Sequence, residues 1–281
     1  MKIIIYSPSY EESSGGITVL HKLCDILIEC GFNAGFYLDK GKPFNVNSKF
    51  KYQGFYLEDL NLENDIIVYP EIIFGNPLKF KKVVRYILNV GHVTLNRKDT
   101  WGEFDYWVYY SERFYDGIKP KVILNIIDSK IDYFKNYNIS RPYKECFTYR
   151  KGKDNLSSLN ILHSPDAIEI DFNKSDEYLI NVFNMCERFY CYDTESYLNV
   201  LASLCGCDSI VIPSKNSDRN KIIDQQPLFK YGVAYGIDEI ESAQKTRPML
   251  YDYLKEKENN QNSETKNTFD NIIEFFQTNN L

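Results

Sequence analysis

The residues best suited to chemistry in this 281-residue chain lie in one turn, Asp193-Thr194-Glu195-Ser196, between a short apolar strand and an apolar helix. A turn that opens a helix offers unpaired backbone N–H groups, a capping side chain and the positive end of the helix dipole. These groups together suit a phosphate, so we expect a bound diphosphate here. The alternative is an ordinary helix cap, because every strand-to-helix turn of an α/β protein needs a capping Asp, Ser or Thr.

Two further groups of residues suit an anion. Gly15 and Gly16 lie in the loop that follows the first strand, and paired glycines let backbone N–H groups approach an anion without obstruction by Cβ. Arg150, Lys151 and Lys153 follow an apolar strand of the second half, and open α/β sheets bind ligands at the carboxyl ends of their strands. A flexible turn and a solvated run of charges are the ordinary alternatives.

The elements that position these residues alternate between apolar strands and helices, the pattern of a parallel sheet covered by helices. In the first half this predicts strands over residues 2–6, 33–38, 65–69, 83–88, 106–110 and 121–124 and a helix over 17–30. In the second half it predicts strands over residues 146–149, 167–171, 189–192 and 209–213 and a helix over 175–186. We expect an α/β protein with two Rossmann-like domains, residues 1–140 and 141–260, and a C-terminal tail or helix over 261–281. The charged, Asn- and Gln-rich residues 255–267 are expected to be solvated or mobile.

The composition limits the partners and the compartment. The net charge is −6, whereas a general nucleic-acid surface needs clustered Lys and Arg, so we expect no nucleic-acid partner. Local basic groups such as Lys79-Phe80-Lys81-Lys82 suit peripheral contact with an anionic membrane surface. No apolar run is long enough to span a bilayer and the N-terminus lacks a signal-peptide pattern, which predicts a cytoplasmic protein. The seven cysteines lack the spacing of a zinc site, and no metal site is expected.

The segment from Tyr192 to Cys207 resembles the donor-binding motif of two-domain GT-B glycosyltransferases, in which an acidic residue precedes a glycine-rich turn and a helix. The resemblance implies that Asp193 takes the first acidic position and that the amides of residues 194–196 face the diphosphate. Leu201 stands where retaining members place a glutamate that accepts hydrogen bonds from the donor ribose, and a leucine accepts none. Ribose recognition therefore differs here, or the donor pocket is degenerate.

Two other segments carry the same resemblance. The order of strand, loop and Gly15-Gly16-Ile17 resembles the glycine loop that lies over the sugar and diphosphate in glycosyltransferases with nucleotide-sugar donors. The segment from Arg85 to His92 resembles a first-domain segment of bacterial polysaccharide transferases, which implies that His92 contacts the sugar or the acceptor. A lone histidine is more often structural. Arg150, with Lys151 or Lys153, is implied to neutralise the departing nucleoside diphosphate.

The resemblance implies two domains whose parallel sheets face a central cleft, with the acceptor bound by the first domain, the nucleotide-sugar by the second, and the C-terminal helix packing back on the first. No Asp-x-Asp motif of metal-dependent transferases occurs. We therefore expect a metal-independent transfer, without a cofactor, from a nucleotide diphosphate-sugar to a glycan or lipid-linked acceptor. A non-catalytic glycan- or nucleotide-binding subunit of a glycan-assembly complex and a nucleotide-sugar epimerase are the alternatives. An inverting transfer needs a base and a retaining one does not, so the stereochemistry stays open.

Overall fold

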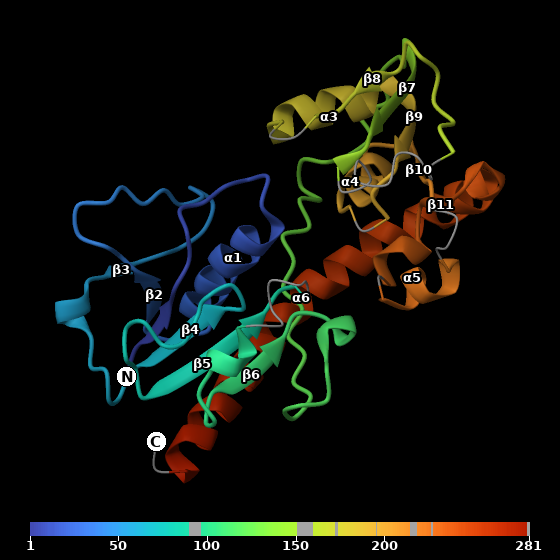
Figure 1. The fold of residues 1–281 in the computed structure, drawn as a ribbon. Helices are drawn as coiled ribbons and strands as arrows, with labels where there is room; N and C mark the ends of the chain where they lie inside the picture. Colours follow the sequence, from blue (N-terminus) through green and yellow to red (C-terminus); the bar gives the residue numbers. More distant parts are fainter. Residues whose placement is uncertain are drawn as a thin grey trace. The chain divides into compact units, whose positions relative to one another are not determined.

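The structure is a computed structural model that describes residues 1–89, 97–150, 160–171, 174–194, 196–213, 218–225 and 227–279. It consists of two α/β units (Figure 1), one formed by Met1–Asp128 with Glu258–Leu281 and the other by Ser129–Lys257. The sequence-based boundary lay at residue 140. Residues 129–140 fall in the second unit because Phe134 is buried in its core and the Tyr137 N–H donates to Asn184 Oδ1 over 2.9 Å.

The sheet of the first unit has the strand order β3-β2-β1-β4-β5-β6, and every pairing is parallel. Its strands are β1 (Ile3–Ile5), β2 (Ala34–Tyr37), β3 (Gly54–Phe55), β4 (Ile66–Pro70), β5 (Lys82–Ile87) and β6 (Tyr106–Tyr109). The expected strand over 121–124 is instead a single bridge between Tyr109 and Ile123. The chain turns from one side of β1 to the other between β3 and β4, so the pair β1 and β4 forms the topological switch point.

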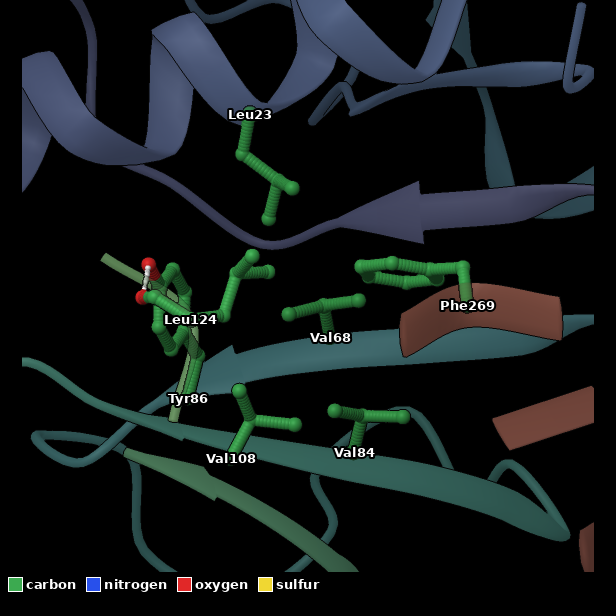
Figure 2. A pocket seen from close by; sticks show the side chains of 7 residues that line it. All are labelled: Leu23, Val68, Val84, Tyr86, Val108, Leu124 and Phe269. Carbon is green, nitrogen blue, oxygen red and sulfur yellow. Dashed lines mark hydrogen bonds between the residues drawn. The ribbon is translucent and has the colours of Figure 1, made fainter. Parts of the chain in front are cut away.

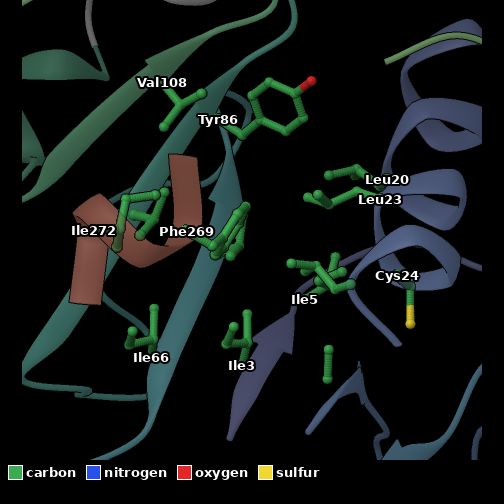
Figure 3. Packing of buried hydrophobic residues seen from close by; sticks show 14 of the residues in the cluster. Ile3, Ile5, Leu20, Leu23, Cys24, Ile66, Tyr86, Val108, Phe269 and Ile272 are labelled. Carbon is green, nitrogen blue, oxygen red and sulfur yellow. The ribbon is translucent and has the colours of Figure 1, made fainter. Parts of the chain in front are cut away.

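One face of this sheet packs against two helices, α1 (Gly15–Glu29) and the C-terminal part of α6 (Ile240–Thr278). Figure 3 shows Leu20 and Leu23 of α1 and Phe269 and Ile272 of α6 directed at side chains of the strands. Leu20, Leu23, Cys24 and Leu27 recur at the helical spacing that places apolar side chains on one face. The other face buries side chains such as Ile67 and Tyr69 against connecting segments.

Residues 255–267 belong to helix α6, and most of their side chains are exposed, in agreement with the expectation of a solvated segment. Two of their polar side chains are buried: Gln261 accepts a hydrogen bond from the Ile127 N–H through Oε1 over 3.1 Å, and Thr265 is fully enclosed. The polar composition of residues 255–267 does not predict a helix. The apolar side chains that pack this part of α6 into the core of the first unit come later in the sequence, at Phe269, Ile272 and Phe276.

The sheet of the second unit has the strand order β11-β10-β9-β7-β8, and it is also parallel. Its strands are β7 (Tyr143–Thr148), β8 (Ile168–Glu169), β9 (Cys186–Cys191), β10 (Asp208–Val211) and β11 (Val233–Tyr235). The chain reverses direction across the sheet between β8 and β9, which makes the adjacent pair β7 and β9 its switch point.

The second sheet is covered on one face by α3 (Asp176–Met185) and α4 (Leu198–Leu204), while Ala243 of α6 lies in the cluster on the other face. A short helix, α5 (Arg219–Gln225), and a 3₁₀ turn over Pro227–Lys230 precede β11. The Tyr178 N–H donates to Ser175 Oγ over 3.3 Å, which caps α3. The seven cysteines are free thiols, and burial raises the pKa of Cys24 and of Cys205 to about 12.

In the described part of the chain, no helix combines the length and the apolar character needed to cross a bilayer.

Candidate functional site

The switch point of the second sheet joins two of the predicted site segments. Arg150 follows β7, and the turn that contains Asp193 and Ser196 follows β9. Arg150 Nη1 donates to Ser196 Oγ over 3.4 Å, although the two residues are 46 positions apart in the chain. The backbone of Arg150 adopts φ 42°, a left-handed conformation that is uncommon for residues other than glycine. The structure thus brings a cation to the edge where open α/β sheets bind ligands.

The turn after β9 also caps its own helix. Ser196 Oγ accepts from the Leu198 N–H over 3.3 Å, and the Ser196 N–H donates to the Asp193 carbonyl oxygen over 3.2 Å. The Ser196 amide is therefore used within the protein. Of the predicted amides, those of Thr194 and Ser196 lie in the described part of the turn, and Glu195 lies outside the described residues.

Asp193 adds a carboxylate to the same place. The Asp193 side chain is buried, and the Cys191 thiol donates to the backbone carbonyl oxygen of Asp193 over 3.2 Å. The pKa of Cys191 is raised to about 12, chiefly by burial and further by the charge of Asp193, while the charge of Arg150 acts in the opposite direction. Both charges thus lie near one buried thiol, at the edge where the strands β7 and β9 end.

Leu201 does not belong to this edge. It is 4% exposed and packs in the core beneath the sheet with Cys146, Phe189 and Ala202. A side chain at this position points into the protein, so it contacts no ribose. The position expected to bind the donor ribose from the motif therefore has a packing role.

Gly15 and Gly16 form the start of α1, at the switch point of the first sheet. A Cβ at Gly15 would meet nothing within 4 Å, and one at Gly16 would lie in ordinary contact with Leu88 Cδ1 at 3.7 Å. By contrast, a Cβ at Gly35 would lie 2.5 Å from the Gln53 carbonyl oxygen, so packing demands that glycine. Packing does not demand the pair at 15 and 16. Ser14, the N-cap of α1, makes no side-chain capping bond, which suits an approaching anion.

The other predicted residues fall elsewhere. His92, Lys151 and Lys153 lie outside the described residues. Arg85, which opens the segment that led to His92, is fully buried: its Nε donates to Asp105 Oδ2 over 2.6 Å and its Nη2 to the Gly75 carbonyl oxygen over 2.6 Å. This arginine is bound to other residues inside the first unit.

Sequence reasoning missed two titratable groups near the strand ends. His163 stacks on Phe147 with ring centroids 3.7 Å apart, and its Nδ1 lies 2.7 Å from the Tyr192 hydroxyl. Burial lowers the pKa of His163, against the charge of Glu145. Glu71 follows β4 directly and is buried. The signal for Glu71 was a carboxylate placed immediately after a strand that is apolar throughout.

A cavity inside the first unit is not a ligand site. Figure 2 shows its apolar lining, with the Tyr86 hydroxyl donating to the Leu124 carbonyl oxygen over 2.6 Å. The lining residues are Leu23, Val68, Val84, Tyr86, Val108, Leu124 and Phe269. The cavity has no room for a water molecule. It is a small gap in core packing.

Among the described residues, no group of three His, Cys, Asp or Glu side chains is arranged to hold a metal ion.

No protein-family model matches the sequence, and no curated protein matches it. Solved structures do match its fold. T4 phage BGT in complex with UDP and Mn²⁺ has a TM-score of 0.52 at 10% identity, covering 97% of this chain and 99% of that one. An alpha-glucosyltransferase in complex with UDP and a 13-mer DNA containing a central A:G mismatch has a TM-score of 0.51 at 12% identity, covering 95% and 94%. A beta-glucosyltransferase described as a DNA modifying enzyme has a TM-score of 0.51 at 10% identity.

These similarities confirm the prediction of a GT-B-like α/β fold with two parallel sheets. They contradict the prediction that excluded a nucleic-acid partner, because a protein of this fold was solved with DNA bound. The physical reason is that net charge is a sum over the whole chain, whereas contacts to nucleic acid depend on where individual cations lie. The acidic balance of this chain therefore excludes no such partner.

Proposed function

We propose that this protein is a glycosyltransferase that moves a sugar from a nucleoside diphosphate-sugar to a hydroxyl group of an acceptor. The observation that carries the proposal is the contact between Arg150 and Ser196 at the switch point of the second sheet. It lies in a fold shared with UDP-bound glucosyltransferases over nearly the whole chain. These proteins favour UDP-glucose as the donor to be tested first.

The residues at this switch point suit the departure of a diphosphate. As the bond between the anomeric carbon and the phosphate oxygen breaks, negative charge develops on the diphosphate. The Arg150 guanidinium stabilises that charge through charge-assisted hydrogen bonds, and the sequence adds Lys151 and Lys153 just beyond it. Asp193 accepts a hydrogen bond from a hydroxyl group of the donor. We propose that these cations neutralise the leaving group without a resident metal.

The acceptor proposed here is DNA that carries a hydroxyl group on a base. The support is the fold shared with an alpha-glucosyltransferase solved with DNA and with a DNA modifying beta-glucosyltransferase. A glycan acceptor is the competing outcome. The test incubates the purified chain with UDP-glucose and either hydroxyl-bearing DNA or a glycan, and follows the mass of each acceptor. Addition of one hexose to DNA supports the proposal, and addition to the glycan alone overturns the choice of acceptor.

A matched pair of variants tests the site. Arg150→Ala removes the cation at the switch point, whereas Arg188→Ala removes an exposed arginine of β9 away from the carboxyl ends of the strands. We expect the first variant to lose donor turnover and the second to retain it. Equal losses of turnover in both variants would show that the effect comes from the removal of any positive charge and not from this site.

A non-catalytic binding subunit is the second candidate, and the buried position of Leu201 favours it. Because the residue at this position packs in the core, it offers no hydrogen-bonding partner to a donor ribose. Such a subunit would bind UDP-glucose and raise its own melting temperature with it. It would release neither UDP nor a sugar product.

A further inference from the structure

Four aromatic rings gather on one face of the second sheet, where β7 and β9 end. Phe147 of β7 pairs with Tyr190 of β9, and Tyr149 and Tyr192 directly follow the two strands. Side chains two residues apart on a strand point to the same face, and all four rings belong to one cluster. The ring centroids of Tyr149 and Tyr192 are 5.1 Å apart. These four rings form an aromatic square.

The His163 ring contacts every member of the aromatic square. It stacks on Phe147 with ring centroids 3.7 Å apart and ring planes 9° from parallel. It lies at an angle to the other three rings, with centroid distances of 5.9 Å to Tyr149, 5.5 Å to Tyr192 and 6.5 Å to Tyr190. One side chain from the segment before β8 therefore contacts the ends of both strands.

A hydrogen bond joins His163 to Tyr192. The Tyr192 hydroxyl oxygen accepts from the Leu162 N–H over 3.0 Å, which leaves the hydroxyl proton to be donated. The Nδ1 atom of His163 lies 2.7 Å from that oxygen, so Nδ1 accepts this proton and the ring proton lies on Nε2. A protonated imidazole has a donor on both nitrogens and accepts nothing. The bond in this form therefore requires a neutral ring.

Two residues of the candidate donor site directly follow the aromatic square. Arg150 comes after Tyr149, and Asp193 comes after Tyr192. The backbone of Arg150 adopts φ 42°, and such a conformation persists only where the surrounding structure holds it. Fixing the two tyrosine rings thus fixes the start of both site segments.

We propose that His163 is a positioning residue of the donor site, an inference that rests on the proposed glycosyltransferase function. The neutral ring fixes Tyr149 and Tyr192, and through them Arg150 and Asp193. Protonation of the ring removes the acceptor of the Tyr192 hydroxyl proton and leaves two donors facing each other. The donor site then loses its alignment, so the binding of UDP weakens in acid.

The groups around His163 determine the pH at which this loss occurs. Glu145 of β7 and Glu169 of β8 carry charges that favour the protonated ring, but burial outweighs them and lowers the pKa of His163 below its ordinary value of 6.5. The other titratable groups in ring contact with it, in the described part of the chain, are Tyr149, Tyr190 and Tyr192. The ring is therefore neutral at neutral pH, and the hydrogen bond is lost as the pH falls through the lowered pKa.

Ser164 provides a matched control on the same segment. Its N–H and its Oγ donate to Glu145 Oε2 over 2.6 Å and 2.7 Å. Glu145 comes earlier in β7 than Phe147, so this contact ties the segment to the sheet without the aromatic square. Ser164→Ala removes one bond of that tie and leaves the contacts of His163 in place.

The test measures the Kd for UDP by calorimetry across the acid and neutral range in the wild type, His163→Phe and Ser164→Ala. His163→Phe keeps a ring for stacking and removes the acceptor. Above neutral pH we expect this variant to bind UDP about 2–10-fold more weakly than the wild type, the effect of one hydrogen bond, and the two Kd values to converge as the pH falls. A phosphate also titrates near pH ~6, but this titration is common to both proteins and cancels in the ratio of their Kd values. Ser164→Ala should lower the melting temperature and keep the wild-type Kd at every pH.

Tyr192→Phe removes the same hydrogen bond from its other end, so its Kd should converge with that of the wild type in the same way. This second variant decides the matter if His163→Phe does not fold.

Three results would overturn the inference. One is equal UDP binding by the wild type and His163→Phe at every pH. Another is a ratio of Kd values that does not change with pH, which marks a packing role for the ring. The third is wild-type binding that strengthens in acid relative to the variant, which marks a charged His163 that contacts the diphosphate. In all three the donor site itself still binds UDP, whereas a wild type that binds no UDP contradicts the proposed donor and the role of His163 together.

Discussion

Replacing Arg150 with alanine tests the donor site most sharply, because the effects on catalysis and on folding are expected to differ widely. The hydrogen bond from Arg150 Nη1 to Ser196 Oγ is long, 3.4 Å. A hydrogen bond of this kind contributes about 1 kcal/mol or less to the free energy of unfolding. For a chain of this size that amounts to a fall in melting temperature of roughly 2–4 °C.

The expected loss of turnover is much larger. A guanidinium that meets the diphosphate only as charge develops acts like a donor of an oxyanion hole, whose removal costs about 10²–10³-fold in kcat, or ~3–4 kcal/mol of transition-state stabilisation. Arg150→Lys keeps the charge without the forked geometry and should fall between wild type and alanine. The assay is release of UDP from UDP-glucose at saturating donor and acceptor.

A turnover of Arg150→Ala equal to that of the wild type would refute the role of Arg150 at the donor site. A loss of activity that matched a large loss of stability in a thermal melt would also refute it, because Arg150 would then be a structural residue. Arg188→Ala serves as the control for a change in net charge, since Arg188 is exposed on the same pair of strands.

Two further predictions concern stability and metal dependence. Phe269→Ala should lower the free energy of unfolding by about 3–5 kcal/mol, because this ring is 1% exposed in the core of the first unit. Urea unfolding followed by circular dichroism measures this loss, and the control Phe104→Ala, at an exposed residue, should change the free energy of unfolding by less than about 0.5 kcal/mol. Equal losses in the two variants would mean that Phe269 does not hold α6 in this core. Addition of EDTA should leave sugar transfer unchanged if Arg150 supplies the neutralising charge, whereas a loss that Mn²⁺ restores would contradict the metal-independent proposal.

The two sheets could be predicted from the sequence because parallel strands are buried on both faces and appear as short continuous apolar runs. The same rule located the carboxyl ends of the strands, which is why Arg150 and Ser196, 46 residues apart, could be assigned to one edge. The rule says nothing of helix faces. The rule therefore does not tell whether the Leu201 side chain lies at the ligand edge or in the core. The structure places it in the core, where it packs with the other residues of its cluster.

The rest depended on long-range contacts that local patterns do not reveal. The polar stretch over residues 255–267 is helical because Gln261 bonds to Ile127, 134 positions earlier, and because Phe269 anchors the next turns. Glu71 attracted no attention because a single glutamate in a sequence looks like any exposed carboxylate. Its burial and the hydrogen bond that it accepts from the Leu88 N–H, just beyond the end of β5, are visible only in the structure.

The measurement that tests the central claim most directly is the mass of hydroxyl-bearing DNA after incubation with the purified protein and UDP-glucose. A mass increase of one hexose, released UDP in equal amount, and loss of both in Arg150→Ala are the predicted results. UDP-glucose that raises the melting temperature without release of UDP, with DNA or a glycan present, would contradict the transferase and identify a binding protein that has kept the fold.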